Sequence, residues 1–202
     1  MSDAIRRLER WLKANRPDYL AQLQPGATDA QLDELEATLD VKLPEALREL
    51  YKWRNGQPDD CYDGLSHNRE FSNINTVREN WEMLTEMIGA DFEHSHWWRR
   101  SWVPFLYNGG GDHVVVDVEG SFGGERGQVL RFWHDWEDRS IVAPSIQSWL
   151  EHFVIALETG VLRWNEEEEM VLEPDELDIV SWSKHLIDGY PVKVNLEDIP
   201  SE

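Results

Sequence analysis

The run of residues 43–56 constrains the fold of this chain more than any other segment. Pro44 fits the first turn of a helix, where the missing N–H of proline costs nothing. Apolar side chains follow at spacings of three and four residues: Leu47, Leu50 and Tyr51. Asn55-Gly56 offers the left-handed backbone that commonly ends a helix. The run therefore predicts a short helix with one face on a core.

Other stretches before residue 90 also have helical periodicity, at residues 3–14, 28–39 and 75–88. In the second of these, Thr28 and Gln31 form a capping-box pattern. The intervening residues 57–75 are polar and rich in turn-forming residues, which predicts a loop. That loop is long for a structureless connection, so it is either functional or contains short elements.

The pattern changes to strands beyond residue 101. Short β-branched or alternating runs, separated by glycine-rich turns, predict strands near residues 102–107, 113–118, 128–133 and 139–142. Ser145 then caps a long amphipathic helix that ends at Gly160. We expect an α+β fold, with a mostly antiparallel twisted sheet flanked by the N-terminal helices and one long helix after the sheet.

The sequence has no internal repeat and no flexible linker, so we expect residues 1–202 to form a single domain. Residues 161–202 are an acidic C-terminal extension. Within it, Pro174 is a candidate start for one more short helix. The apolar residues at alternate positions 192, 194 and 196 predict either an extended strand or a frayed end.

Several short motifs follow one another at compatible spacing in residues 28–160. In order they are Leu35-Glu36, the helix of residues 43–56, Trp102-x-Pro104, Asp117, Gly127-x-Val129 and the helix from Ser145 to Leu150. This series resembles the SUKH superfamily, which includes the fungal Smi/Knr cell-wall-assembly regulators and many bacterial immunity proteins. The resemblance implies a binding protein and not an enzyme. The shared motif residues look structural, which assigns partner choice to the divergent loops.

Two functions follow from this resemblance. The leading expectation is a bacterial immunity protein that binds and neutralises a cognate toxin of nuclease type by occluding its active site. The alternative is a non-enzymatic regulatory scaffold in cell-wall or glucan synthesis. Because the fungal branch usually carries long disordered flanks and this sequence shows none, the bacterial role is the first expectation.

Charge and composition exclude several other classes. The formal net charge of −21 opposes binding to nucleic acid, because that binding depends on Lys and Arg contacts to phosphates. It suits a basic protein partner, although acidity that only maintains solubility is an equal alternative. No run approaches the ~18 apolar residues of a membrane span, and the N-terminus lacks the apolar core of a signal peptide. The single cysteine, Cys61, rules out an internal disulfide, so we expect a cytoplasmic protein. The sequence predicts no particular oligomeric state.

Three groups of residues are candidates for partner binding. Two are acidic, and each has the alternative of being an ordinary solvated face. The third is a tryptophan pair. Adjacent side chains on a strand point to opposite faces, so both tryptophans cannot enter the same core. The other one either serves as an exposed anchor or is covered by the C-terminal extension. The groups are Asp59, Asp60 and Asp63; Glu166, Glu167, Glu168 and Glu169; and Trp97 and Trp98.

No residue is predicted to be catalytic or to bind a metal or cofactor. His94 and His96 lack further ligands at a recognisable spacing. His134 and Asp135 suggest a triad with Ser145, but that serine is already explained as a helix cap and no nucleophile elbow precedes it. The glycines at 109–111 lack the Lys-Ser/Thr of a phosphate-binding loop and fit a hairpin turn better.

Overall fold

Each helix predicted before residue 90 is present in the computed structural model, which describes residues 1–92, 96–172 and 181–196. One additional short helix begins at Pro17, which occupies a first-turn position instead of only ending the preceding helix. In chain order the helices are α1 (Asp3–Asn15), α2 (Pro17–Gln22), α3 (Asp29–Leu39), α4 (Glu45–Trp53), α5 (Ile74–Glu86), α6 (Ile146–Thr159) and α7 (Ser181–Leu186).

The strands confirm the expected antiparallel sheet and extend it at both edges. Their order is β1-β2-β3-β4-β5-β8, with every neighbouring pair antiparallel. The bounds are β1 (Glu70–Phe71), β2 (Trp102–Tyr107), β3 (His113–Asp117), β4 (Gln128–Phe132), β5 (Asp138–Ala143) and β8 (Val192–Asn195). The predicted C-terminal strand is thus present as β8. A separate hairpin joins β6 (Arg163–Asn165) to β7 (Met170–Leu172).

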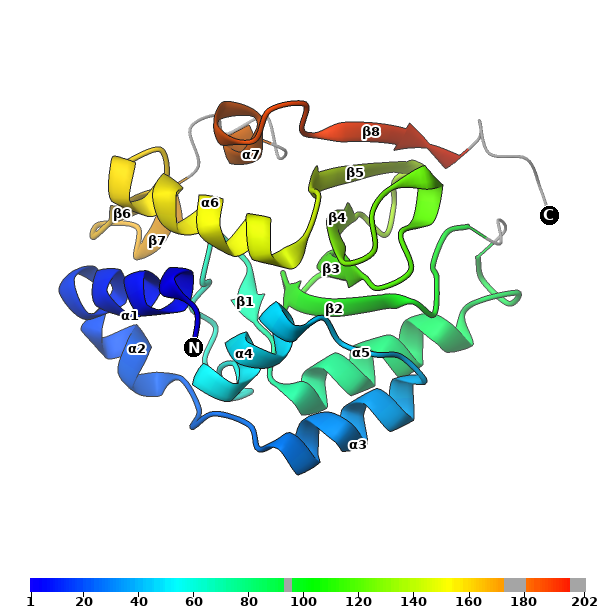
Figure 1. Cartoon of the computed structure of the whole chain (residues 1–202), viewed down its shortest axis with the longest axis horizontal. Coiled ribbons are helices and arrows are strands. Elements are labelled where there is room, and N and C mark those ends of the chain that lie inside the picture. Colours follow the sequence, from blue (N-terminus) through cyan, green and yellow to red (C-terminus); the bar gives the residue numbers. More distant parts are fainter. Residues whose placement is uncertain (93–95, 173–180, 197–202) are drawn as a thin grey trace.

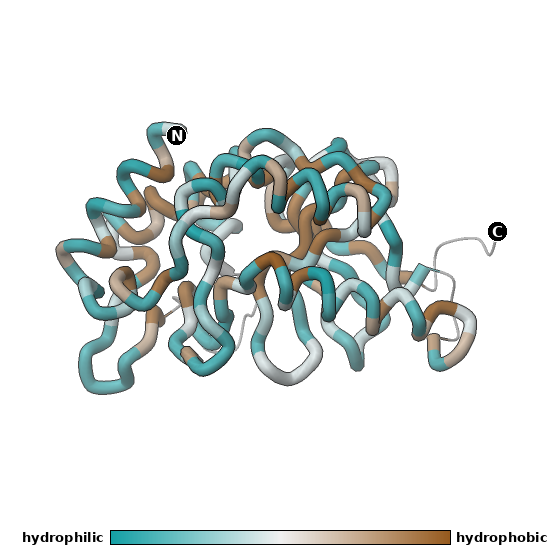
Figure 2. Tube along the Cα trace, turned by 90° about the horizontal axis from the view of Figure 1, so that it is seen from below, coloured by the Kyte–Doolittle hydropathy of each residue, from teal (hydrophilic) through white to brown (hydrophobic). Residues whose placement is uncertain are grey.

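The helices are arranged around the sheet by their apolar faces. In Figure 1, α3 and α5 lie below β2, and α6 runs beside the sheet with α1, α2 and the β6–β7 hairpin at its far end. Figure 2 shows hydrophobic stretches toward the middle of the molecule and hydrophilic ones along its periphery. The fold is α+β, as expected.

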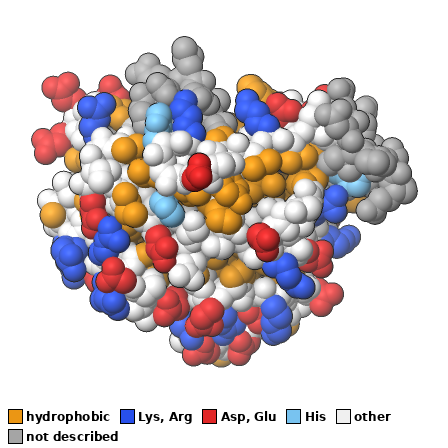
Figure 3. Space-filling view, turned by 45° about the horizontal axis from the view of Figure 1, so that its top comes forward, with side chains coloured by type: hydrophobic (Ala, Val, Ile, Leu, Met, Phe, Trp, Pro, Cys, Tyr) orange, Lys and Arg blue, Asp and Glu red, His pale blue; other side chains and the backbone are white. Residues whose placement is uncertain are grey.

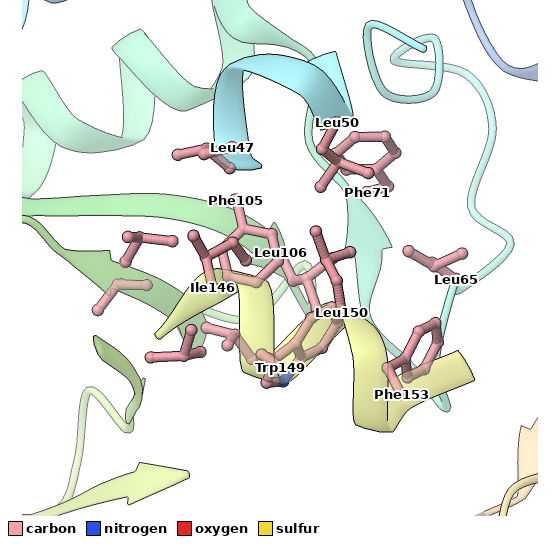
Figure 4. Close-up of a cluster of buried hydrophobic side chains, with 14 of the residues drawn as sticks. Leu47, Leu50, Leu65, Phe71, Phe105, Leu106, Ile146, Trp149, Leu150 and Phe153 are labelled. Carbon is pink, nitrogen blue, oxygen red and sulfur yellow. The ribbon is translucent and has the colours of Figure 1, made fainter. Parts of the chain in front are cut away.

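The core forms where α4 and α6 meet the sheet (Figure 4). Leu50 of α4 is 1% exposed. From α6, Trp149 meets Phe105 of β2 edge-on, with ring centroids 5.2 Å apart, and stacks on Phe153 at 4.9 Å. Large aromatic faces therefore hold α6 to the sheet.

The caps of α3 and α6 are those that the sequence predicts. Thr28 and Gln31 form the complete capping box of α3. The Ser145 hydroxyl accepts from the Ser148 N–H at 3.1 Å, and Gly160 closes α6 with a left-handed backbone at φ +76°. These local signals are sufficient to set the helix ends.

The expected role of Asn55-Gly56 as the end of the helix is wrong. Helix α4 ends at Trp53, followed by Arg54 in an extended conformation. Asn55 instead accepts at Oδ1 from the Ile74 N–H at the start of α5 (3.1 Å). Gly56, at φ +64°, lies so close to the Ser72–Asn73 backbone that a Cβ would be only 2.5 Å from the Asn73 nitrogen. The pair joins α4 to the beginning of α5.

Other parts of the sequence interpretation need correction or lie outside the described residues. The loop of residues 57–75 contains β1, and the β6–β7 hairpin was not predicted. Trp97 lies in a bend and not on a strand. The candidate helix start at Pro174 falls outside the described residues. Helix α7 begins at Ser181. Over the described ranges, no helix combines the length and apolar character that crossing a membrane requires.

Candidate partner-binding surface

Two of the predicted acidic groups meet in one hollow, which we call the acidic pocket. It has a volume of about 420 Å³ and lies between the α1–α2 junction, the loop before β1 and the β6–β7 hairpin. Four carboxylates line it, from residues far apart in sequence: Asp18, Asp63, Glu166 and Glu169. Trp164 contributes an apolar wall. The pocket concentrates carboxylates around the aromatic side chains of Trp164 and Tyr19.

Arg16 forms a rigid base for the acidic pocket. Its guanidinium carbon lies 4.2 Å from the ring centroid of Tyr19 and 4.3 Å from that of Trp164. Its Nη1 donates to the Gly64 carbonyl at 2.7 Å. Burial lowers the pKa of Arg16 and raises that of Tyr19. One buried cation thus ties together the helix junction, the loop and the hairpin, which are the segments that carry the surrounding carboxylates.

The carboxylates of residues 166–169 are presented by the turn of the β6–β7 hairpin. Asn165 Oδ1 accepts from the Glu167 N–H at 2.9 Å, and Glu169 has a left-handed backbone at φ +50°. All four glutamates are exposed, but Glu167 and Glu168 do not line the pocket. The His67 N–H donates to the Val171 carbonyl at 3.1 Å, which joins the loop carrying Asp63 to this hairpin.

Asp59 and Asp60 lie outside the acidic pocket. Asp59 Oδ1 accepts from Asn73 Nδ2 at 2.9 Å and from the Thr76 hydroxyl at 3.4 Å, so this carboxylate helps to fix the first turn of α5. Asp60 is exposed. The three loop aspartates therefore do not form one patch.

Cys61, in the same loop, is 5% exposed. Burial raises the pKa of its thiol, and the nearby charges of Asp63 and Glu70 add to that effect. A raised pKa reduces the thiolate fraction, which opposes nucleophilic behaviour.

The tryptophan pair divides between core and surface. Trp98 is 1% exposed and packs edge-on against Trp102 and Phe132, with ring centroids 5.6 and 5.2 Å away. Its Nε1 donates to the Thr85 hydroxyl at 3.3 Å. Trp98 is therefore wrong as a candidate surface anchor, because its whole side chain is inside the core. Trp97 is half-buried and remains a candidate.

The histidine and serine considered for catalysis are engaged separately, the histidine by two aspartates and the serine by a helix end. His134 Nδ1 lies 2.8 Å from Asp112 Oδ1, and its Nε2 lies 3.1 Å from Asp135 Oδ2. The Ser145 hydroxyl caps α6. Of the candidate metal ligands, His94 falls outside the described residues, and the described part of the chain contains no group of three or more His, Cys, Asp or Glu that could hold a metal ion.

Comparison with known sequences agrees with the order of motifs along the chain. Residues 26–152 match the SMI1 / KNR4 family (SUKH-1), and the chain belongs to this family. The resemblance seen in the sequence is therefore confirmed. The matched segment runs from the turn before α3 to the middle of α6, so it includes the central strands and excludes the β6–β7 hairpin.

The similar proteins include fungal regulators. A cell wall biosynthesis/cell cycle regulator of Schizosaccharomyces pombe is 25% identical over 84% of this chain and 38% of its own length. A glucan synthesis regulatory protein of Neurospora crassa is 22% identical over 87% and 43%. A KNR4/SMI1 homologue of Debaryomyces hansenii is 23% identical over 76% and 35%. The chain thus spans about two-fifths of the length of these relatives.

The leading functional expectation is wrong. These relatives are named as fungal cell-wall and glucan-synthesis regulators and not as bacterial toxin-immunity proteins. The preference for immunity depended on the absence of long flanks. That absence has no weight, since the chain corresponds to only part of each relative.

Proposed function

We propose that this chain is a non-catalytic regulatory module of cell-wall or glucan synthesis, which acts by binding a basic segment of a partner protein at the acidic pocket. The observation that carries the regulatory role is membership of a family whose matched fungal relatives are named as such regulators. The binding mode is supported by the convergence of Asp63 with Glu166 and Glu169 around Trp164.

Lysine and arginine side chains are the complementary ligands for such a pocket. Exposed ion pairs contribute only about 0–1 kcal/mol each, so several carboxylates acting together are needed to hold a partner. The net charge of −21 adds long-range attraction, which raises association rates by roughly 10- to 1,000-fold at low salt. We therefore expect an interaction that is fast and sensitive to salt.

One face of the molecule offers less charge selectivity than the acidic pocket. On the face shown in Figure 3, Lys and Arg side chains are interspersed with Asp and Glu around a central hydrophobic area. Mixed charges of this kind cancel within about one Debye length, ~10 Å at 0.1 M salt. A basic partner is therefore discriminated by a local cluster of carboxylates more than by the face as a whole.

A domain replacement tests the regulatory role. The segment of the Schizosaccharomyces pombe regulator that matches this chain is replaced by the chain itself, and cell-wall glucan content is compared with that of strains carrying the intact regulator or lacking the segment. We expect the chimaera to restore most of the glucan content. A Leu50→Asp chimaera, in which the core is disrupted, is the negative control. A chimaera that is expressed and folded yet behaves like the strain lacking the segment would contradict the proposal.

A further inference from the structure

A second hollow, which we call the apolar groove, lies at the C-terminal end of α5. Its volume is about 540 Å³, and it is bounded by α5, the turn after it, Trp97 and the loops around Gly111 and His134. The apolar lining is Met83, Leu84, Met87, Phe92 and Trp97. Met83 is 46% exposed, although most large apolar side chains of the described chain are buried. In Figure 1, the C-terminal end of α5, which bounds the groove, lies at the opposite end of the molecule from α1, α2 and the β6–β7 hairpin, which bound the acidic pocket.

The aromatic part of the groove is held rigidly from behind. Phe92 and Trp97 are stacked, with ring centroids 6.2 Å apart and an interplanar angle of 27°. The fully buried Arg139 lies under Trp97, 5.2 Å from its ring centroid, and donates from Nη2 to the Trp97 carbonyl at 2.8 Å. The Trp97 side chain is therefore already ordered before a partner binds. Such preorganisation lowers the entropy cost of binding and favours affinity.

The methionines make the rest of the groove adaptable. Met83 lies in the last turn of α5 and Met87 is the residue at its C-terminal cap, and both side chains are unbranched. Methionine side chains adjust to apolar groups of different shapes and are frequent on surfaces that bind peptides. A rigid aromatic wall opposite a flexible methionine wall suits the apolar stripe of a peptide.

The charges around the groove favour an occupant with positive charge. Exposed carboxylates form its rim: Asp91, Asp135 and Glu137. Glu82 and Glu86 are also exposed on α5, on either side of Met83. The last turn of α5 contains no basic side chain, so the negative end of the helix dipole has no cation from its own helix.

We propose that the apolar groove binds an amphipathic segment of a partner protein whose apolar stripe is flanked by Lys or Arg. The apolar side chains of that segment lie on Met83, Met87 and Trp97, and its cations face the carboxylate rim. This mode of helix-in-groove recognition needs an apolar floor and a complementary charged border, and the groove has both. The inference does not depend on the acidic pocket or on the proposed regulatory role.

The four methionines of the chain provide the readout. Met83 and Met87 line the groove, Met170 follows Glu169 beside the acidic pocket, and Met1 lies at the N-terminus near Glu49. The full chain, labelled with ¹³C at the methionine methyl groups, is titrated with a synthetic Leu/Lys peptide that has leucines at i, i+3, i+4 and i+7. We expect saturable shifts of the Met83 and Met87 signals and little change at Met1 and Met170.

Control peptides separate the two components of recognition. A Leu/Glu peptide with the same stripe tests the charge of the rim, and a Lys/Gly peptide tests charge without an apolar face. Neither should shift Met83 and Met87. Equal shifts with the Leu/Glu peptide would overturn the choice of a basic partner. A shift at Met170 alone would place the Leu/Lys peptide in the acidic pocket and overturn the groove as its site.

A matched pair of variants tests the groove directly. Met83→Glu places a charge on the exposed methionine, and Tyr62→Glu does the same at an exposed aromatic outside the groove, where Tyr62 is 80% exposed. We expect Met83→Glu to weaken binding of the Leu/Lys peptide roughly tenfold, as loss of an anchoring side chain does. Tyr62→Glu should bind as the parent does.

Equal affinity of the two variants, with both folded as judged by thermal unfolding, would overturn the proposal. A concentration-dependent shift of Met83 and Met87 in the peptide-free protein would also overturn it, because the occupant would then be a second copy of this chain.

Discussion

Asp117 lies at the end of β3 with its side chain fully buried. Its carboxylate accepts from backbone N–H groups of the following turn and from two side chains. The donors are the N–H groups of Glu119, Gly120 and Ser121, the Ser101 hydroxyl and Gln128 Nε2. This motif residue therefore organises the β3–β4 connection and offers no free group to a partner.

Replacing Asp117 by alanine should be strongly destabilising. Each buried donor left without an acceptor costs about 1–3 kcal/mol, and several donors lose their acceptor together. We expect a loss of roughly 3 kcal/mol or more in the free energy of unfolding, measured by chemical denaturation. The matched control is Asp135→Ala on the exposed rim, which should stay within ~0.5 kcal/mol. A similar, small loss for both variants would contradict the structural role of Asp117.

His113 makes the folded chain sensitive to acid. Its ring is 1% exposed and stacks on Tyr107 at a centroid distance of 4.8 Å. Burial lowers the pKa of His113 to about 3. Unfolded chains bind this proton below a pH of ~6.5, whereas the folded chain excludes it until about pH 3. Stability is therefore lost as the pH falls through this window.

The variant His113→Phe should remove this loss, because phenylalanine keeps an aromatic ring against Tyr107 and takes up no proton. Between pH 7 and pH 5 the parent should lose about 2 kcal/mol more than the variant, since each unit below ~6.5 costs ~1.4 kcal/mol. Urea denaturation at the two pH values measures the difference. Substitution of the exposed His185 by Gln is the control and should leave the pH dependence of the parent unchanged. Equal acid sensitivity of His113→Phe and the parent would show that another group is responsible.

At the scale of elements, α4 is the helix on which the fold depends most. Leu47, Leu50 and Tyr51 are all buried. Figure 4 shows Leu47 and Leu50 in the same apolar cluster as the side chains of α6, and the Tyr51 ring lies 5.4 Å from that of Phe71 in β1. The Tyr51 hydroxyl donates to the Ser72 carbonyl at 3.1 Å, which connects the helix to the chain that follows β1. The spacing of these residues in the sequence predicted their common face.

Truncation of Leu50 to alanine should cost about 2–5 kcal/mol, the range for removal of a buried leucine side chain. Chemical denaturation of the variant measures this cost. Met83→Ala, at a half-exposed position of α5, is the matched control and should cost much less. A loss below ~0.5 kcal/mol for Leu50→Ala, a typical surface value, would contradict the placement of α4 in the core.

Elements with strong local signals could be predicted from the sequence, and those defined by distant partners could not. The β-branched run of β3 and the Ser145 cap of α6 are readable from a few adjacent residues. Strand β1 contains only Glu70 and Phe71 and exists because it pairs with β2. The β6–β7 hairpin likewise depends on pairing across an acidic turn that resembles a solvated face.

The candidate site was only partly predictable for the same reason. Asp63 and Glu166 were predicted as members of two separate acidic groups. About a hundred positions separate them, and no local pattern predicts that they line one pocket. Trp97 and Trp98 are adjacent, and only the packing of the bend shows which one is buried. The apolar groove was missed because Met83 and Met87 read as part of an ordinary amphipathic helix.

For the whole molecule, the elements that bound the two hollows lie at opposite ends (Figure 1), so the two proposals together predict that one chain contacts two partners, or two segments of one partner, at the same time. Both hollows are bordered by carboxylates, so both select against acidic ligands. The shared family motifs lie between them, in the sheet and in the helices α3 to α6.

The overall charge leads to a prediction about nucleic acid. With a net charge of −21, duplex DNA and RNA should show no measurable association at physiological salt, because few phosphate contacts can form. An electrophoretic shift assay measures this. Micromolar binding would contradict the electrostatic argument and indicate that a local basic surface outweighs the acidic remainder.

The central claim, that the acidic pocket is where this regulatory module holds its partner, is tested most directly by charge reversal within the yeast chimaera. Asp63→Lys with Glu166→Lys reverses two pocket charges, and Glu34→Lys with Glu125→Lys reverses two exposed charges elsewhere. The control variant should remain folded, since exposed substitutions usually change stability by less than ~0.5 kcal/mol each. Asp63 is half-exposed, so the fold of the pocket variant is verified by thermal unfolding. We predict that the pocket variant loses the restoration of cell-wall glucan while the control variant keeps it. Full restoration by the folded pocket variant would contradict the account.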